Sequence, residues 1–168
     1  NPVPHNKRGG KMKNIENWQE KNRKKLYKLL GDLPKRDYPI KEKMKIIEEK
    51  ENYILEKLLL DLNGYENVPA YFIKPKNIKR PVPVVIFNHS HGGKYYLGKD
   101  EFIKGNDYME KPPYADVISC LGYAGICIDH INFGDRSGRD ELDLFKEFIW
   151  NGKVLWGLMV YDSIRTVD

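Results

Sequence analysis

Apolar and polar positions along the chain first form a helix-like pattern. From Asn14 onward, apolar residues recur at approximate helical spacing among lysines and glutamates, at Ile15, Trp18, Leu26, Leu29 and Leu30. Gly31 and Pro34 follow, and these residue types end helices. The pattern therefore predicts a helix from about residue 14 to residue 30. Residues 41–50 are predicted to form a second, short helix.

Strand-like patterns follow in the middle of the chain. Tyr53 to Leu62 and Val68 to Lys74 read as two strands, and Asn63-Gly64 between them is a turn signal, so we expect a β-hairpin. Residues 82–87 are almost entirely apolar and rich in β-branched side chains, which predicts a strand buried on both faces. Ala124–Ile131 has the same character.

Helical segments separate and follow these later strands. Pro112-Pro113 is expected to open a helix over residues 114–121, which Gly122 ends. Asp140 is expected to cap another helix, and a further one runs from about Lys153 to the end. Buried strands that alternate with helices predict an α/β fold: a mostly parallel sheet with an antiparallel N-terminal hairpin and helices on both faces.

Charge divides the 168-residue chain into two parts. The first 50 residues hold 15 Lys/Arg and 7 Asp/Glu, whereas the remaining 118 hold 14 and 17. We therefore separate a basic N-terminal arm with helices (residues 1–50) from the α/β portion (residues 51–168). Residues 1–13, with two prolines and two glycines, are expected to be a disordered or loosely attached arm. A basic segment suits nucleic acid or an anionic membrane, but we favour a solvated amphipathic helix, because no nucleic-acid-reading module is present.

The two cysteines, Cys120 and Cys127, lack the C-x-x-C spacing of metal or redox sites. Buried free thiols fit a reducing compartment, so we expect a cytoplasmic protein. No apolar run reaches transmembrane length and no signal peptide is visible. Because the chain begins at Asn1 and not at Met, a leader that was removed remains an open alternative.

The polar turn after residues 82–87 carries the most informative chemistry. It reads Asn88-His89-Ser90-His91-Gly92-Gly93-Lys94. Turns at the carboxyl ends of buried strands are where α/β proteins place ligands. Adjacent glycines allow backbone N–H groups to approach a bound atom, and such donors stabilise a developing oxyanion. We expect the N–H groups of His91 and Gly92 to be these donors, with His89, Ser90 and Gly93 beside the substrate; the alternative is a tight turn with structural histidines.

This turn resembles the H-G-x-G-G type turn of α/β-hydrolases, most closely that of bacterial esterases of the dienelactone-hydrolase and acetyl-xylan-esterase-like group. Other segments agree with the resemblance, which spans about residues 15 to 168: Val68-Pro69-Ala70-Tyr71, Gly98-Lys99-Asp100-Glu101-Phe102, Ala124-Gly125, Asp129 and Phe133-Gly134-Asp135-Arg136-Ser137. One departure is Ser90, where the family usually has glycine. The resemblance implies an α/β-hydrolase fold and a serine-dependent mechanism.

The nucleophile that the resemblance implies is not found in these 168 residues. In the family it lies in a G-x-S-x-G turn, and no such string occurs here; the serines are Ser90, Ser119, Ser137 and Ser163. We therefore expect a chain truncated before the nucleophile strand, which by itself does not hydrolyse esters. A triad improvised from Ser90, His130 and Asp129 is disfavoured, because adjacent residues of a strand point to opposite faces.

Three further residues are candidates for the cleft. Asp129 and His130 end a predicted strand and are expected either to line the cleft or to form a satisfied polar pair. Arg136, in the charged loop that follows, is expected either to bind an acidic substrate group or to hold the loop through ion pairs. No cofactor is implied, and no Cys/His/carboxylate spacing predicts a metal site.

The sequence thus predicts part of a carboxylic-ester hydrolase acting on a small-molecule or carbohydrate ester, with no nucleic-acid or membrane partner and with self-association left open. The alternative from another class is a non-catalytic α/β binding domain that keeps an anion or carbonyl pocket. Neither the substrate nor the oligomeric state follows from the sequence.

Overall fold

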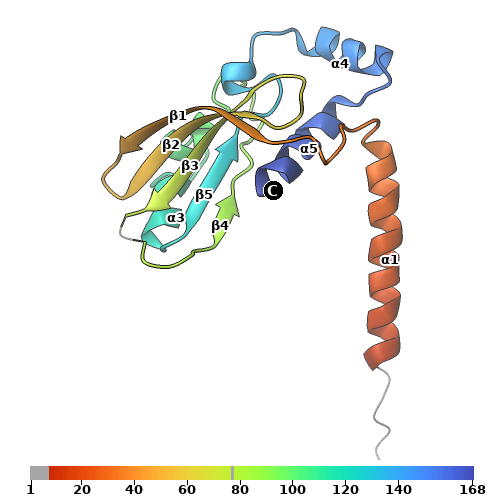
Figure 1. Ribbon diagram of the computed structural model, residues 1–168, viewed down its shortest axis with the longest axis horizontal. Coiled ribbons are helices and arrows are strands. Elements are labelled where there is room, and N and C mark those ends of the chain that lie inside the picture. Colours follow the sequence, from red (N-terminus) through yellow and green to blue (C-terminus); the bar gives the residue numbers. More distant parts are fainter. Residues whose placement is uncertain (1–7, 77) are drawn as a thin grey trace, which may run out of the picture.

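The computed structural model describes residues 8–76 and 78–168, and side chains of the first helix from Asn14 onward. Its centre is a five-stranded sheet with the order β1-β2-β3-β5-β4 (Figure 1). The strands are β1 (Lys41–Glu49), β2 (Tyr53–Asp61), β3 (Val68–Pro75), β4 (Val84–Ile86) and β5 (Ala124–Ile128). The helices are α1 (Arg8–Leu29), α2 (Asp100–Lys104), α3 (Tyr114–Cys120), α4 (Glu141–Trp150) and α5 (Leu155–Val167), with a 3₁₀ turn η1 at Gly134–Arg136.

The predicted hairpin is confirmed. β2 and β3 pair antiparallel over their full length, from Tyr53 opposite Pro75 to Leu60 opposite Val68. Gly64 in the turn has φ 76°, a conformation that glycine adopts without strain. The Asn63 side chain accepts hydrogen bonds from the N–H groups of Tyr65 and Glu66, at 2.8 and 3.1 Å, which closes the turn.

The prediction of a mostly parallel sheet is wrong. Only β4 and β5 pair in parallel, whereas β1 with β2, β2 with β3 and β3 with β5 are antiparallel. Short turns between β1, β2 and β3 force neighbouring strands to reverse direction, so these three form a meander. The single parallel pair arises where α2 and α3 connect β4 to β5.

The prediction of a short helix over residues 41–50 is also wrong, because this segment is β1. Its side chains are nearly all exposed, so no apolar stripe favours either structure. What decides the outcome is a partner: β1 pairs with β2 from Lys41 opposite Asp61 to Glu49 opposite Ile54. Ion pairs of Lys45 with Glu56 (3.4 Å) and of Lys57 with Glu48 join the two strands.

The strand predicted to be buried on both faces lies instead at the edge of the sheet. β4 has three residues, and Val84 and Val85 are 52% and 36% exposed. Within the described residues it pairs with β5 alone, and an edge strand with one neighbour cannot be buried all round. β5, by contrast, lies between β3 and β4 and is buried at every residue, as predicted.

One face of the sheet packs against helices. Leu55, Ile73 and Cys127 meet Phe102 of α2 and Ile118 of α3 in a buried cluster. A second cluster of buried residues joins Ile131 to α4 and α5. Asp140 caps α4 as predicted: its carboxylate accepts the N–H of Asp143 at 3.0 Å. The predicted helices over residues 114–121 and from Lys153 are confirmed as α3 and α5; helix cover of the second face stays a prediction.

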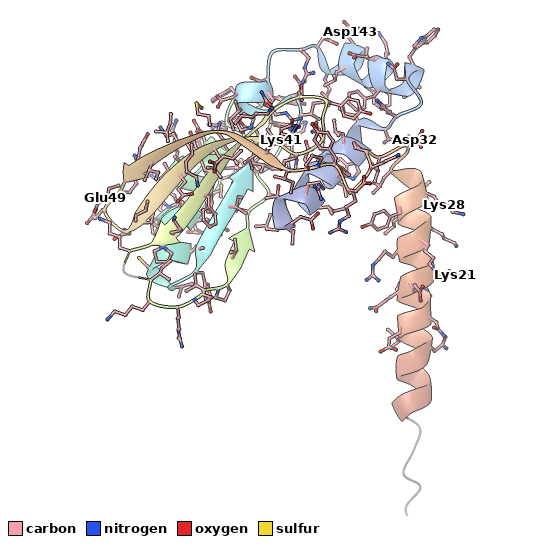
Figure 2. All side chains as sticks on the ribbon, viewed as in Figure 1. Lys21, Lys28, Asp32, Lys41, Glu49 and Asp143 are labelled. Carbon is pink, nitrogen blue, oxygen red and sulfur yellow. The ribbon has the colours of Figure 1, made fainter. Side chains whose placement is uncertain are left out.

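The N-terminal helix stands away from the sheet (Figure 1). It begins at Arg8, earlier than the predicted start at Asn14, and Gly31 follows its end with φ 73°. From Asn14 onward its large apolar residues are exposed, from 45% at Tyr27 to 72% at Leu29. Lys21 and Lys28 project into solvent along it (Figure 2). The predicted disordered arm covered residues 1–13. Residues 8–13 belong to α1, so this part of the prediction is wrong, and residues 1–7 lie outside the described residues. The division into residues 1–50 and 51–168 stays a prediction.

Candidate functional site

The glycine turn that follows β4 lies at the carboxyl end of the parallel pair. Phe87 continues the strand, its N–H donating to Ile126 O at 2.8 Å, and the chain then turns through residues 88–94. Gly92 and Gly93 have φ values of 42° and 70°. A Cβ on Gly92 would lie 2.7 Å from the Tyr108 hydroxyl, so this position needs glycine for both its backbone and its contact.

The hydrogen bonds of this turn leave several backbone donors, Gly93 N–H among them, without a protein acceptor in the described residues. The Ser90 N–H donates to Glu101 Oε2 at 2.5 Å, and the Lys94 N–H donates to His91 O at 3.2 Å. Within the described part of the chain, the N–H groups of His91 and Gly92 donate to no protein acceptor. Unpaired N–H groups in a glycine turn suit an oxyanion or another acceptor brought by a ligand.

Ser90 does not need the glycine that its position usually holds in the resembling family. Its φ is negative, because the one non-glycine residue with positive φ in the described chain is Asn132. Its hydroxyl lies 2.6 Å from Glu101 Oε1 and contacts the Tyr108 hydroxyl. The Ser90 side chain is therefore engaged with α2 and the segment after it, and not with a histidine.

His89 and His130 lie against each other and are both neutral. The His130 N–H donates to His89 Nε2 at 3.1 Å, and His89 Nδ1 lies 3.2 Å from Ser90 O, which assigns its proton to Nδ1. Burial lowers the pKa of His89, although its hydrogen bond to Ser90 O opposes this. Burial, with His89 and Arg136 nearby, lowers the pKa of His130 to about 4. Neither ring offers a positive charge at neutral pH.

Asp129 belongs to a buried ion-pair cluster and not to a cleft wall. It is 0% exposed, and its carboxylate accepts from the Lys99 N–H (2.6 Å), from Lys99 Nζ (2.8 Å) and from the Asp135 N–H (3.0 Å). A Cβ on Gly98 or Gly134 would run into this carboxylate. The interpretation of Asp129 as a satisfied buried group, one of the two alternatives from the sequence, fits this geometry.

Arg136 is likewise turned inward. Its guanidinium is 7% exposed and donates to Glu66 (2.8 Å), to Asp162 (2.9 Å) and to the carbonyl oxygen of Asp129 (2.8 Å). All its donating nitrogens are thus used to tie the loop after β5 to the β2–β3 turn and to α5. This is the loop-holding alternative, and it leaves no free guanidinium edge for an acidic substrate.

The improvised triad has no geometric support. The Asp129 carboxylate faces Lys99, the His130 ring packs on His89 with ring centroids 4.9 Å apart, and the Ser90 hydroxyl faces Glu101. No hydrogen bond among the described residues joins the three side chains to one another.

A cavity of about 740 Å³ opens beside the glycine turn. His89, Ser90, His91 and His130 form its polar side. The opposite side is apolar and comes mainly from α5, with Trp156, Met159, Val160, Ile164 and Val167. The site residues predicted from the sequence therefore separate. His89, Ser90, His91 and His130 line the cavity, whereas the lining does not include Gly92, Gly93, Asp129 and Arg136.

Several residues that build this site were missed by the sequence interpretation. Glu101, from the unpredicted helix α2, accepts hydrogen bonds from Ser90 and from the Tyr108 hydroxyl. The His91 ring is held by Tyr95, whose hydroxyl lies 2.5 Å from Nε2. A buried glutamate beside Phe102 carries no local signal, since only the folded chain places it under the turn.

The described residues contain neither a metal-binding group beside this site nor a membrane-spanning helix. Among the described residues, no group of three or more His, Cys, Asp or Glu side chains is placed to hold a metal ion. No helix in residues 8–76 or 78–168 is long and apolar enough to cross a bilayer.

Solved structures identify the class of fold. The chain superposes with a TM-score of 0.71 on the crystal structure of a putative acetyl xylan esterase from Bacteroides fragilis, with 21% sequence identity over 92% of this chain and 43% of that one. At this identity the likeness concerns the fold alone. The chain therefore has a mixed α/β, esterase-like fold.

A closer sequence relative is the putative hydrolase YtaP of Bacillus subtilis. It is 53% identical over 146 residues, which is 87% of this chain and 48% of the relative. The chain thus spans about half the length of the curated relative that it matches. No protein-family model matches the chain.

Proposed function

We propose that this chain is the part of a serine-dependent carboxylic-ester hydrolase, of the acetyl-esterase or dienelactone-hydrolase type, that carries the oxyanion turn. The observation that carries the proposal is a glycine turn in which the N–H groups of His91 and Gly92 have no acceptor among the described residues, and of which His91 lines the cavity of about 740 Å³. The name of the Bacillus subtilis relative and the esterase-like fold support the same reaction class.

The proposed chemistry is acyl transfer through a serine. A serine hydroxyl attacks the ester carbonyl carbon while a histidine takes its proton, which forms a tetrahedral oxyanion. The N–H groups of His91 and Gly92 donate to that oxygen. The intermediate collapses to an acyl-enzyme as the alcohol leaves with the proton from the histidine. Water then gives a proton to the histidine and attacks the acyl carbon, and the serine takes up that proton as the acid is released. One such donor typically contributes ~10²–10³ in kcat.

The serine, its histidine and its acid are proposed to come from polypeptide beyond Asp168. Two surfaces of the described chain support this: the exposed edge strand β4 and the apolar side of α5 at the cavity. A strand that adds to β4 in parallel and then turns would bring a G-x-S-x-G serine to the cavity mouth opposite His91. The substrate proposed is an ester of a small or carbohydrate alcohol.

The decisive experiment compares the 168-residue chain with the complete reading frame that contains it, using p-nitrophenyl acetate. We expect turnover by the complete protein and none above a protein blank by the 168-residue chain. A strand followed by G-x-S-x-G within ~30 residues, about one βα unit, supports the enzyme. A stop codon directly after Asp168 supports the non-catalytic binding domain. If the 168-residue chain hydrolyses the ester and Ser90→Ala abolishes this turnover, the proposal that the nucleophile lies beyond Asp168 is overturned.

A further inference from the structure

The glycine turn needs an external support to act as an oxyanion site. Gly92 and Gly93 have no side chains that fix the backbone, and Gly93 has nothing within 4 Å of where a Cβ would lie. Oxyanion donors are effective only when they are held in place before the reaction, because a displacement of about 1 Å costs ~10²-fold in rate. The contacts that hold the turn therefore decide whether its N–H groups work.

A single buried carboxylate supplies most of these contacts. Glu101 is 1% exposed. Its Oε2 accepts the Ser90 N–H at 2.5 Å, and its Oε1 accepts the Ser90 hydroxyl at 2.6 Å. Oε1 also accepts Asn106 Nδ2 at 3.0 Å and the Tyr108 hydroxyl at 2.9 Å. Both oxygens face donors, and the Ser90 N–H belongs to the residue directly before the proposed oxyanion donors.

Glu101 is itself held in place by the core. The next residue, Phe102, is 0% exposed and its ring stacks on Phe87 with centroids 5.3 Å apart. Phe87 directly precedes the turn. The short helix α2 therefore contacts the residue after β4 through Phe102 and binds the turn through Glu101. These contacts fix the strand, the helix and the turn to one another.

The segment after α2 closes the same support. Tyr108 packs against Gly92, and Asn106 accepts a hydrogen bond from Lys94 Nζ at 3.1 Å. Lys94 also pairs with Asp107. The turn is thus bound at its start by Glu101, at its middle by Tyr108 and at its end by Asn106 and Asp107.

We propose that Glu101 is a positioning residue for the oxyanion donors: by binding the Ser90 N–H and hydroxyl it fixes the backbone that carries the His91 and Gly92 N–H groups. This inference rests on the proposed ester hydrolase function. Glu101 is a positioning residue and not a catalytic one, since it does not line the cavity and its carboxylate binds Ser90.

The carboxylate is required in this role and an amide is not equivalent. If glutamine replaced Glu101, one of its two oxygen positions would become an NH₂ donor. At the Oε2 position that NH₂ would face the Ser90 N–H, and at the Oε1 position it would face Asn106 Nδ2. Asn106 cannot simply turn over, because its oxygen accepts from Lys94 and from the Asp107 N–H. Glu101→Gln therefore keeps the shape and loses one anchor.

The first arm of the test uses the complete protein. Glu101→Gln should lower kcat about tenfold or more, up to the ~10²–10³ of a lost oxyanion donor, while KM changes little, because the donors act mainly on the transition state. The matched control is Glu110→Gln, an exposed carboxylate nine residues further along. A normal kcat in Glu101→Gln overturns the inference. So does a loss of activity that is explained entirely by a lower folded fraction in thermal unfolding.

The second arm uses the 168-residue chain and does not need activity. Amide NMR signals of Ser90, His91 and Gly92 should shift or broaden in Glu101→Gln and remain unchanged in Glu110→Gln. Unchanged His91 and Gly92 signals in Glu101→Gln overturn the positioning role, whatever the enzyme does. If the complete wild-type protein hydrolyses no ester but the NMR arm behaves as expected, the proposed function fails while the support of the turn by Glu101 stands.

Discussion

The turns after β4 and β5 begin at the carboxyl ends of two neighbouring parallel strands, yet they use their polar groups in opposite ways. In the β4 turn, residues 88–94, the N–H groups of His91 and Gly92 have no acceptor within the described part of the chain, and residues 88–91 line the cavity. In the loop after β5, His130 also lines the cavity, but the charged Asp129 and Arg136 are buried in ion pairs. A polar segment after a strand is thus a candidate site only where it lines a cavity and keeps donors without a protein partner.

The difference has a structural origin. Asp129 meets Lys99 and Arg136 meets Asp162, so each charge of the β5 loop has a partner of opposite sign from another element. Buried charges are tolerated only when they are paired in this way. The β4 turn carries two glycines, and its one charged side chain, Lys94, pairs with Asp107 outside the cavity lining. The loop after β5 stabilises the fold, and the β4 turn is available to a ligand.

The largest effect is expected from breaking the β5 loop. Asp129→Ala leaves Lys99 buried with only the exposed Asp135 as partner, which should lower the free energy of unfolding by about 3–5 kcal/mol. Urea unfolding measures this. The control Asp143→Ala removes an exposed carboxylate that pairs with Lys146, and should change stability by less than about 0.5 kcal/mol. An Asp129→Ala variant as stable as wild type would contradict the scaffold role of this loop.

Proline in the β4 turn should act on catalysis instead. Gly92→Pro removes a proposed donor and cannot adopt φ 42°, so kcat of the complete enzyme should fall by ~10²–10³ or more, with a smaller effect on KM. Gly138→Pro is the matched control: Gly138 also has positive φ, at 107°, but lies in the β5 loop. It should lower stability and leave kcat unchanged. Folding is checked by circular dichroism, and near-normal kcat in a folded Gly92→Pro enzyme would remove the turn from the mechanism.

Alanine at the two glycines of the β4 turn separates backbone strain from contact. Both Gly92→Ala and Gly93→Ala place a side chain at positive φ, which costs about 1–2 kcal/mol. Gly92→Ala should cost more, because its Cβ also meets the Tyr108 hydroxyl at 2.7 Å, whereas Gly93 has open space. Thermal unfolding of the pair gives the difference. Equal losses would show that Tyr108 moves aside freely and does not hold the turn.

The smallest effect is a difference in pH dependence between the two regions. Burial alone would raise the pKa of Glu101, but hydrogen bonds from Ser90, Asn106 and Tyr108 lower it below its ordinary 4.5. The stability that Glu101 contributes is therefore complete above pH 4.5 and is lost as pH falls through the lowered pKa. For Asp162, which pairs with Arg136 of the β5 loop, the dependence of stability on pH has the opposite sign. Burial raises the pKa of Asp162 above its ordinary value, although Arg136 and Asn63 act to lower it.

Urea midpoints between neutral pH and about pH 3 test this, because the ordinary glutamate pKa of ~4.3 lies inside that range. Glu101→Gln should be less stable than wild type at neutral pH and should lose less stability below pH 4.5. An acid response identical to wild type would mean that Glu101 is not held by these donors in solution.

Local patterns in the sequence were sufficient for the elements whose signals are local. Asn63-Gly64 marked the hairpin, Asp140 marked the start of α4, and the apolar run at 124–131 marked the buried strand β5. The turn at residues 88–94 was also visible, because two glycines after an apolar run restrict the backbone to few conformations. These features depend on residues close to one another in the chain.

Other features were decided only by contacts between distant segments. Lys41–Glu49 is a strand because β2 lies beside it, and its own side chains favour no structure strongly. Asp129 and Arg136 are internal because Lys99 and Asp162, 30 and 26 residues away, neutralise them. Glu101 lies under the turn because Phe102 anchors α2 in the core. Strand direction, charge pairing and the support of the turn are properties of the packed chain, since each depends on a partner that local periodicity does not specify.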